Sequence, residues 1–285
     1  MSDKRILTVQ DISCVGQCSL TVALPILSAA GLETAILPSA VLSTHTGGFT
    51  GFTFRDLTED IPGIIAHWQA EGIRFNAVYT GYLGSAKQIA LVRQMFEVLR
   101  SDESFVSIVD PAMADCGKLY TGFDAAFVQE MKTLTAAADI ILPNITEACL
   151  LTGTEYREEY DEAFISDLLS RLKAGGAQTI ILTGVGFTPE TTGIAVSEGD
   201  TLRYYQHRRI SKGSHGTGDV YASAFVGAYL RGRSAYDAAA IAADYTVKCI
   251  ENTVSDPGHW YGVKFEQVLP YYIERLKQSP GLHAF

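Results

Sequence analysis

Residues 77–142 read AVYTGYLGSAKQIALVRQMFEVLRSDESFVSIVDPAMADCGKLYTGFDAAFVQEMKTLTAAADIIL, a stretch in which short apolar runs alternate with longer segments. Three runs have the length of strands: Ala77–Thr80, Phe105–Val109 and Ile140–Leu142. The segments between them, Ala86–Arg100 and Gly122–Ala137, have helical periodicity. Short apolar strands that alternate with helices are typical of a mainly parallel sheet with helices on both faces. The stretch therefore predicts an α/β fold.

The same alternation extends toward both ends of the chain. On the N-terminal side we expect a strand, a helix, a strand and a helix, at Arg5–Gln10, Cys18–Ala30, Glu33–Leu42 and Thr58–Glu71. On the C-terminal side we expect a helix, a strand and an antiparallel strand pair, at Asp161–Ala174, Thr179–Thr183, Thr192–Val196 and Leu202–Gln206. Three helices close the chain, at Asp219–Leu230, Ala235–Ile250 and Phe265–Leu276. The strand pair gives the predicted sheet a mixed edge.

The length and composition favour one domain. The chain has 285 residues, of which 47% are hydrophobic, so it can bury a large core. This length permits one or two domains, but a single α/β domain of this size is ordinary. No internal repeat and no linker interrupts the sequence. We therefore expect one domain over residues 1–285.

Charge and cysteine usage narrow the class of protein. The chain carries 22 basic and 32 acidic residues, a net charge of −10, and its densest basic run is only His207–Arg209. Because proteins that bind nucleic acid need clustered Lys and Arg, we expect no nucleic acid partner. No apolar stretch approaches the roughly 20 residues that span a bilayer, and no secretory signal is present, so no membrane partner is expected. Five cysteines without C-x-x-C spacing argue against a disulfide framework and a zinc site. A cytoplasmic protein is expected.

The strongest local signal for chemistry is the run Gly213–Asp219, GSHGTGD, which leads directly into an apolar helix. Glycines let consecutive backbone N–H groups converge, and the start of a helix adds partial positive charge, so the run predicts an anion cradle suited to phosphate. Asp219 would lie beside that cradle, where a carboxylate can accept a proton from an attacking hydroxyl. The alternative is that Asp219 only caps the helix.

Other phosphate and hydrolase motifs are absent. The sequence contains no G-x-x-x-x-G-K-[ST], and Pro189 stands where a dinucleotide fingerprint beginning at Gly184 needs its third glycine. It also contains no H-E-x-x-H and no G-x-S-x-G. Zinc hydrolysis and serine-hydrolase chemistry are therefore not expected.

Two further polar clusters follow predicted strands. Asp110 ends one strand, with Asp115 shortly after it, and the run Pro143–Glu147 ends the next. Ligands of α/β sheets bind beyond the carboxyl ends of the strands, and carboxylates there can hold Mg²⁺ through water. The alternative is structural, because Asp-Pro and Pro-Asn mark turns and Glu147 suits the first turn of a helix.

Six motifs together resemble one family along most of the chain. They are Ile6–Gln10 (ILTVQ), Ser43–Gly47 (STHTG), Thr80–Ser85 (TGYLGS), Val109–Pro111 (VDP), Pro143–Glu147 (PNITE) and Gly216–Asp219 (GTGD). In this order they resemble the pyridoxal (vitamin B6) kinases of the ribokinase superfamily, over about Arg5 to Asn252. The TGYLGS run and the STHT loop are the more specific motifs, whereas GTGD is shared across much of the superfamily.

The resemblance implies a ribokinase-like fold and transfer of the γ-phosphoryl group of ATP to the 5′-hydroxymethyl group of pyridoxal, pyridoxamine or pyridoxine. It implies Asp219 as the base, with backbone amides of Gly216, Thr217 and Gly218 holding the developing phosphate charge. It assigns Mg²⁺ to Asp110 and Glu147, the nucleotide phosphates to Asp115, Asn144, Thr183 and Thr217, and the pyridine pocket to Cys18, His45, Thr46 and Tyr82. It also implies a homodimer, and it leaves dependence on a monovalent cation such as K⁺ open.

Two positions depart from the family pattern. The first strand of the family ordinarily ends Gln-Ser, but Asp11 follows Gln10 here, so a carboxylate would face the substrate ring. The alternative is that Asp11 caps the turn Ile12–Gly16 and points away from the pocket. Ala114 replaces a usual glycine, which could shift Asp115.

Two rival functions remain at this stage. Hydroxymethylpyrimidine kinase of thiamine synthesis is the closest enzymatic rival, because it also phosphorylates a hydroxymethyl group on a small nitrogen heterocycle. His45, Thr46 and Tyr82 favour pyridoxal, whereas Asp11 weakens that match. A non-catalytic vitamin B6 binding protein is the rival from another class, and the presence of Asp219 argues against it.

Overall fold

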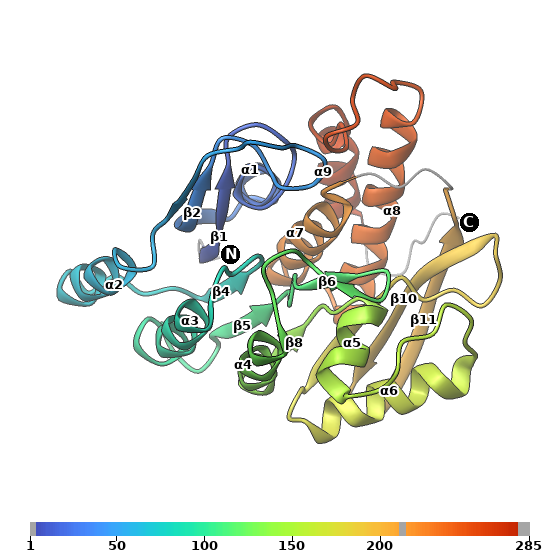
Figure 1. Cartoon of the computed structure of the whole chain (residues 1–285), viewed down its shortest axis with the longest axis horizontal. Coiled ribbons are helices and arrows are strands. Elements are labelled where there is room, and N and C mark those ends of the chain that lie inside the picture. The colour runs from blue at the N-terminus through green and yellow to red at the C-terminus, as the bar shows by residue number, and fades with distance from the viewer. Residues whose placement is uncertain (1–3, 211–214, 279–285) are drawn as a thin grey trace. The chain divides into compact units, whose positions relative to one another are not determined.

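The computed structural model describes residues 4–210 and 215–278, and these fall into two compact units. Unit 1 combines the two ends of the chain, Met1–Glu59 and Ile210–Phe285. Unit 2 is the continuous stretch Asp60–Arg209. Each unit has its own strands and helices (Figure 1).

Unit 1 contains the first strands and the last helices of the chain. Its elements are β1 (Arg5–Ser13), α1 (Leu20–Ala29), β2 (Glu33–Leu42), β3 (Phe54–Asp56), α7 (Thr217–Leu230), α8 (Ala235–Thr253), the 3-10 turn η1 (Glu266–Val268) and α9 (Leu269–Lys277). Strand β1 pairs with β2 in parallel, and β3 joins β2 in the antiparallel direction. Helix α1 packs against β1, β2 and α7, and α7 packs against α8.

Unit 2 contains a six-stranded sheet in the order β11-β10-β9-β8-β5-β4 and a separate hairpin, β6–β7. Its strands are β4 (Ala77–Thr80), β5 (Val106–Val109), β6 (Ala114–Asp115), β7 (Lys118–Leu119), β8 (Ile140–Ile141), β9 (Thr179–Thr183), β10 (Thr191–Glu198) and β11 (Thr201–Arg208). Its helices are α2 (Ile61–Ala70), α3 (Ala86–Val98), α4 (Ala125–Ala136), α5 (Ile145–Thr152) and α6 (Glu162–Ala174).

The strand directions confirm the predicted α/β class with a mainly parallel sheet. Strands β4, β5, β8 and β9 run parallel, and their residues are almost all buried, which explains their unbroken apolar sequences. Strand β10 is antiparallel to both β9 and β11, so the predicted mixed edge is also confirmed.

Several predicted boundaries differ from the structure at the ends of helices. The predicted helix from Thr58 begins at Ile61, and the predicted helix from Phe265 becomes a 3-10 turn before α9 begins at Leu269. Both helices carry a proline in the first turn, where the fixed φ favours a helix start and no N–H is needed. Helix α4 begins at Ala125 because the Asp124 side chain accepts from the Phe127 N–H and caps it.

Strand β1 is longer than predicted. It continues beyond Gln10 to Ser13, and its register with β2 shifts between Gln10 and Ile12. Asp11 therefore lies at an irregularity inside a strand rather than in a turn. Such irregularities are frequent beside functional sites, where they redirect a side chain.

Helix α5 was predicted only as the structural alternative for Glu147, and the structure confirms that Glu147 lies in the first turn of a helix. Asn144 accepts from the Glu147 N–H, and the Glu147 carboxylate accepts from the Asn144 N–H, which is a complete capping box. Gly153 ends the helix in the left-handed conformation. The spacing of Asn144 and Glu147 was the sequence signal for this helix.

Candidate active site

The start of α7 has the open backbone that an anion cradle requires. Gly216 precedes the helix with a φ of 74°, and a Cβ there would lie 1.8 Å from the Gln17 carbonyl oxygen. Only glycine fits this position. At Gly218 a Cβ would meet no atom within 4 Å, so this side of the first turn is open. The helix begins at Thr217 rather than at Asp219, and Gly213 and Ser214 of the predicted glycine turn lie outside the described residues.

Asp219 lies in the first turn of α7, as predicted. The pKa of its carboxyl is raised to about 7, chiefly by burial and also by the negative charge of Asp11, while the Ser19 backbone N–H acts to lower it. A carboxyl group whose pKa is near neutrality is well suited to general-base catalysis. Its position and its acidity therefore agree with the predicted role.

Asp11 is 5% exposed and belongs to the same cluster. Its carboxylate accepts from the Ser13 hydroxyl at 2.9 Å. Burial raises its pKa, whereas the nearby hydroxyls of Ser19 and Ser13 lower it. The negative charge of Asp11 raises the pKa of Asp219, so the two carboxylates interact, and the predicted place of Asp11 in the substrate pocket stays a prediction.

Cys18 is close enough to both carboxylates to feel their charge, and it is a protonated thiol. Burial raises its pKa well above the ordinary value, and the charges of Asp219 and Asp11 raise it further. A thiol with this environment is a poor nucleophile. Its sulfur would lie 3.4 Å from a Cβ at Gly216, which makes Cys18 a packing residue beside the cradle.

His45 is buried, and both of its ring nitrogens are used within the protein. Nδ1 accepts from the Gly47 N–H at 3.1 Å, so the proton lies on Nε2, which donates to the Tyr261 carbonyl at 2.8 Å. Because both ring nitrogens are engaged, the ring offers a bound molecule its face or edge rather than a hydrogen bond. Thr46, the next residue, is exposed.

The sequence patterns did not identify an aromatic cluster that covers this loop. Phe49 lies with its ring centroid 5.0 Å from that of His45, 4.6 Å from that of Trp260 and 6.4 Å from that of Tyr261. The side chain of Gln17 makes two hydrogen bonds in the same region. Its oxygen accepts from His259 at 2.7 Å, and its nitrogen donates to the Glu266 carboxylate at 2.7 Å. Residues 259–262 carry no motif, and only tertiary contacts bring them to the loop.

In unit 2, the start of α5 holds the hairpin β6–β7. The Glu147 carboxylate accepts from the Met113 N–H at 2.9 Å, and the Asn144 side chain donates to the Ala114 carbonyl at 2.7 Å. The Thr146 hydroxyl accepts from the Gly117 N–H at 2.9 Å. These three side chains of the predicted PNITE motif therefore fix the hairpin. Ala114 has ordinary strand geometry, so replacing the family's glycine needs no special backbone conformation.

Of the other predicted nucleotide and metal residues, Asp110 and Thr183 lie at the carboxyl ends of strands of the sheet in unit 2, Asp115 lies in the hairpin, and Thr217 begins α7 in unit 1. Asp110 follows β5 and accepts from the Ala112 N–H at 3.1 Å. Thr183 ends β9 and pairs with Asn144, the residue before α5. Asp115 is exposed in β6. This is the position at which open α/β sheets bind ligands.

Glu147 is almost fully buried, at 2% exposure. Burial raises its pKa, and its bonds from backbone N–H groups lower it. Across the described part of the chain, no three His, Cys, Asp or Glu side chains form a metal cluster. Protein-bound Mg²⁺ usually keeps several waters and uses one or two carboxylates with substrate phosphates, so the oxygen donors of Asp110 and Glu147 fit that ion.

Tyr82 follows β4 in unit 2. Its ring lies 5.4 Å from that of Phe123, which stacks on Phe127 at 4.0 Å. Its predicted role in the pyridine pocket stays a prediction.

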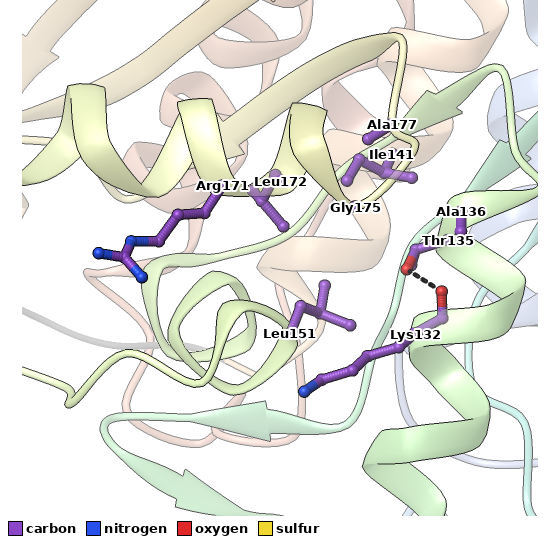
Figure 2. Close-up of a pocket in the computed structure, with 9 residues that line it drawn as sticks. All are labelled: Lys132, Thr135, Ala136, Ile141, Leu151, Arg171, Leu172, Gly175 and Ala177. Atoms are coloured by element: carbon purple, nitrogen blue, oxygen red, sulfur yellow. Dashed lines mark hydrogen bonds between the residues drawn. The ribbon is translucent and has the colours of Figure 1, made fainter.

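A separate cavity of about 90 Å³ lies in unit 2 (Figure 2). It is lined by Lys132, Thr135, Ala136, Ile141, Leu151, Arg171, Leu172, Gly175 and Ala177. None of these is a predicted site residue. The guanidinium of Arg171 is already paired with Asp167 at 2.7 Å. We therefore do not include this cavity in the candidate active site.

In residues 4–210 and 215–278, every helix is too short or too polar to cross a membrane. All five cysteines are free thiols.

Comparison with known proteins assigns the family. The family model for phosphomethylpyrimidine kinase matches residues 36–263. A curated relative, the hydroxymethylpyrimidine/phosphomethylpyrimidine kinase of Bacillus subtilis, is 29% identical over 78% of both chains.

Two solved structures match nearly the whole chain. One is a protein from Bacteroides thetaiotaomicron that is provisionally named a phosphomethylpyrimidine kinase. It is 34% identical, and the match covers 95% of this chain and 94% of that protein, with a TM-score of 0.91. It also has a crystal form with pyridoxal. The other is pyridoxal kinase from Lactobacillus plantarum, which is 32% identical. The match covers 95% of this chain and 97% of that protein, with a TM-score of 0.87. These matches confirm the predicted ribokinase-like fold and the resemblance to pyridoxal kinases. The chain therefore belongs to the phosphomethylpyrimidine kinase family of the ribokinase superfamily, whose members here include kinases named for pyridoxal and for hydroxymethylpyrimidine.

Proposed function

We propose that this kinase transfers the γ-phosphoryl group of ATP to the 5′-hydroxymethyl group of pyridoxal, pyridoxamine or pyridoxine. The observation that carries the proposal is the Asp219 carboxyl, with a pKa near 7, in the first turn of α7 beside the open glycine backbone. The choice of a B6 vitamer is supported by the 34% identical structure in a crystal form with pyridoxal.

In the proposed reaction the substrate hydroxyl oxygen forms a bond to the γ-phosphorus, and the bond between that phosphorus and the bridging oxygen of ADP breaks. The hydroxyl proton goes to Asp219. The amides of Gly216, Thr217 and Gly218 hold the negative charge that develops on the transferred group. Catalysis of this kind depends on position and electrostatics more than on covalent chemistry.

The remaining residues bind and orient. We assign the nucleotide phosphates to Asp115, Asn144, Thr183 and Thr217, the ring to Asp11, Cys18, His45, Thr46 and Tyr82, and Mg²⁺ to Asp110 and Glu147. When bound, Mg²⁺ would neutralise part of the negative charge of the phosphates. Asp110 and Glu147 would hold it through water, because backbone N–H groups already bond to Glu147. A homodimer in the cytoplasm remains part of the proposal.

The second candidate is hydroxymethylpyrimidine kinase, which the matching family model and the Bacillus subtilis relative favour. The two functions differ in the alcohol that is used best. Steady-state kinetics with ATP and Mg²⁺ over pyridoxal, pyridoxamine, pyridoxine and hydroxymethylpyrimidine test this directly, with the product identified by ³¹P NMR. We expect a higher kcat/KM for a B6 vitamer. A higher value for hydroxymethylpyrimidine would overturn the proposal, and tight vitamer binding without turnover would indicate a non-catalytic binder.

A further inference from the structure

Gln17 lies between β1 and α1 and forms hydrogen bonds through both ends of its side-chain amide. The Glu266 carboxylate can only accept, so the amide nitrogen donates to it, at 2.7 Å. The amide oxygen then accepts from Nε2 of His259, also at 2.7 Å. Both partners belong to residues 259–266, which we call the aromatic segment. One side chain therefore binds this distant segment at two points.

The backbone of Gln17 contacts the same segment and the start of α7. Its N–H donates to the Tyr261 carbonyl at 3.4 Å. A Cβ at Gly262 would lie 2.5 Å from the Gln17 Cβ, so this close packing needs glycine. On the other side, the Gln17 carbonyl oxygen lies where a Cβ at Gly216 would otherwise be. The aromatic segment and the glycine backbone before α7 thus meet at one residue.

The Tyr261 carbonyl also holds His45. Nε2 of His45 donates to this oxygen at 2.8 Å, so one carbonyl accepts from both Gln17 and His45. The loop around His45 meets the aromatic segment again at Trp260, whose ring centroid lies 4.6 Å from that of Phe49. The position of the His45 ring therefore depends on the position of the aromatic segment.

The far end of the aromatic segment is attached to α8 instead. The Thr253 hydroxyl accepts from the Lys264 N–H at 2.8 Å, and the Asn252 side chain donates to the Lys264 carbonyl at 3.1 Å. The Asn252 side chain also donates to Gln267, directly after the segment, at 3.1 Å. A change in the Gln17 side chain should therefore release the first half of the segment while the second half stays on α8.

We propose that Gln17 is a positioning residue, which through the aromatic segment and the Tyr261 carbonyl holds the His45 ring in place for the alcohol substrate. A wall that is fixed before binding avoids the free-energy cost of ordering it on binding. Gly216 meets the backbone of Gln17 rather than its side chain, so a side-chain change should spare the phosphate cradle. The identity of the alcohol rests on the proposed function, whereas the link between Gln17 and the His45 loop does not.

The first test is Gln17→Met, because methionine has a similar length and makes neither side-chain bond. In steady-state kinetics with pyridoxal, ATP and Mg²⁺, KM for pyridoxal should rise about 3- to 10-fold, the range expected for loss of one hydrogen bond. KM for ATP should stay unchanged. Lost stability alone would lower the amount of active enzyme, and thus the apparent kcat, without changing either KM.

The matched control is Gln267→Met, which removes the bond from Asn252 next to the same segment and leaves Gln17 intact. Both KM values should stay as in the wild type. A rise in KM for pyridoxal equal to that of Gln17→Met would trace the effect to general loosening of the segment and overturn the proposal.

An exchange of the two partners tests whether the bond to Glu266 carries the effect. Gln17→Glu places one carboxylate against another and should raise KM for pyridoxal at least as much as Gln17→Met does. Glu266→Gln added to it supplies an amide that can donate to the new carboxylate, to which His259 can still donate. The double variant should therefore recover the wild-type KM, and failure to recover would count against the proposal.

Trp260 reports on the loop without any substrate. The chain has two tryptophans, so Trp68→Phe leaves Trp260 as the single one. Trp260 is 45% exposed and packs on Phe49. In the ligand-free protein with this background, Gln17→Met should shift the emission to longer wavelength and increase quenching by acrylamide. Gln267→Met should do neither.

The proposal is overturned if Gln17→Met leaves KM for pyridoxal unchanged, if only kcat falls, or if the Trp260 emission stays as in the parent protein. Failure of the proposed function has a different signature. In that case the wild type does not phosphorylate pyridoxal, or uses hydroxymethylpyrimidine with a higher kcat/KM. The Trp260 emission of the ligand-free variants then still decides whether Gln17 holds the loop.

Discussion

At the scale of single residues, the role of Asp219 is tested most directly by Asp219→Asn. The amide cannot take the substrate proton, so kcat should fall by about 10² to 10⁴-fold while ATP still binds. Steady-state kinetics and a nucleotide-binding titration measure the two quantities separately. A variant with nearly normal kcat would leave Asp219 as a helix cap only.

The same substitution should change how stability depends on pH. The pKa of Asp219 is about 7 in the folded protein and about 3.9 in an unfolded chain, so folding favours the protonated form. The stabilising contribution is complete below about pH 4 and is lost as the pH rises through 7. Asp219→Asn has no such loss. We expect it to exceed the wild type in unfolding free energy by up to about 4 kcal/mol at pH 8 and to match it near pH 4.

Thermal or urea unfolding at both pH values measures this difference. Comparison of variant with wild type removes the contribution of Glu147, whose pKa is also raised by burial. An equal gap at pH 4 and pH 8 would contradict the assigned ionisation of Asp219.

Asp11 is the residue most suited to set substrate choice. A buried carboxylate favours a ring cation or a hydrogen-bond donor and disfavours a phenolate oxygen. Asp11→Ser restores the usual family residue, and we expect it to change kcat/KM unequally for pyridoxal, pyridoxamine and hydroxymethylpyrimidine. Equal ratios for all three alcohols would remove Asp11 from specificity and leave the kinase assignment intact.

At the scale of elements, the hairpin β6–β7 and the start of α5 form one connected feature. If Glu147 holds Mg²⁺ through water, Glu147→Gln should raise the Mg²⁺ concentration for half-maximal rate more than it raises KM for pyridoxal. The rate is measured across Mg²⁺ at fixed ATP. An unchanged Mg²⁺ titration would count against the assignment.

A control is needed because glutamine also disturbs the hairpin. Thr146→Val removes the acceptor for the Gly117 N–H without changing charge. It should speed hydrogen exchange at Gly117 and leave the Mg²⁺ titration in place. A similar Mg²⁺ shift in both variants would trace the effect to hairpin position.

The elements that carry the candidate site residues also explain which of these residues could be predicted from the sequence. Asp219 and the glycines before it could be predicted as candidate site residues because they are adjacent in the sequence and form one motif. Trp260 and Tyr261 could not, because only the fold brings them to the loop of His45 and Phe49. The capping box of α5 was present in the sequence, but its residues were interpreted mainly as ligands.

At the scale of the whole molecule, periodicity predicted the strands well and helix ends less well. Ala77–Thr80 and Thr179–Thr183 have the predicted bounds, since a buried strand is an uninterrupted apolar run between turns. The end of β1 was missed because Asp11 and Ser13 are polar residues buried in a strand through each other's hydrogen bond. Polar residues at functional sites violate the pattern from which strands are predicted.

The expectation of a single domain concerns whether the two compact units unfold together. The chain passes between them at residues 59–60 and 209–210 without a long linker, so we expect one cooperative transition. A destabilising change placed within unit 1 tests this. Arg275 of α9 is 6% exposed and pairs with Asp244 of α8 at 2.6 Å, and both lie in unit 1.

Arg275→Ala should lower the unfolding free energy by about 3 to 5 kcal/mol, because removing one partner leaves a largely buried charge uncompensated. If the units unfold together, hydrogen exchange should accelerate by the same factor for slowly exchanging amides of β2 in unit 1 and of β9 in unit 2, since both then exchange through global opening. Asp244→Ala combined with Arg275→Ala should recover part of the loss, as both charges are then absent. Acceleration confined to β2 would mean that unit 2 keeps its structure when unit 1 opens, and the chain would then have two domains in the thermodynamic sense.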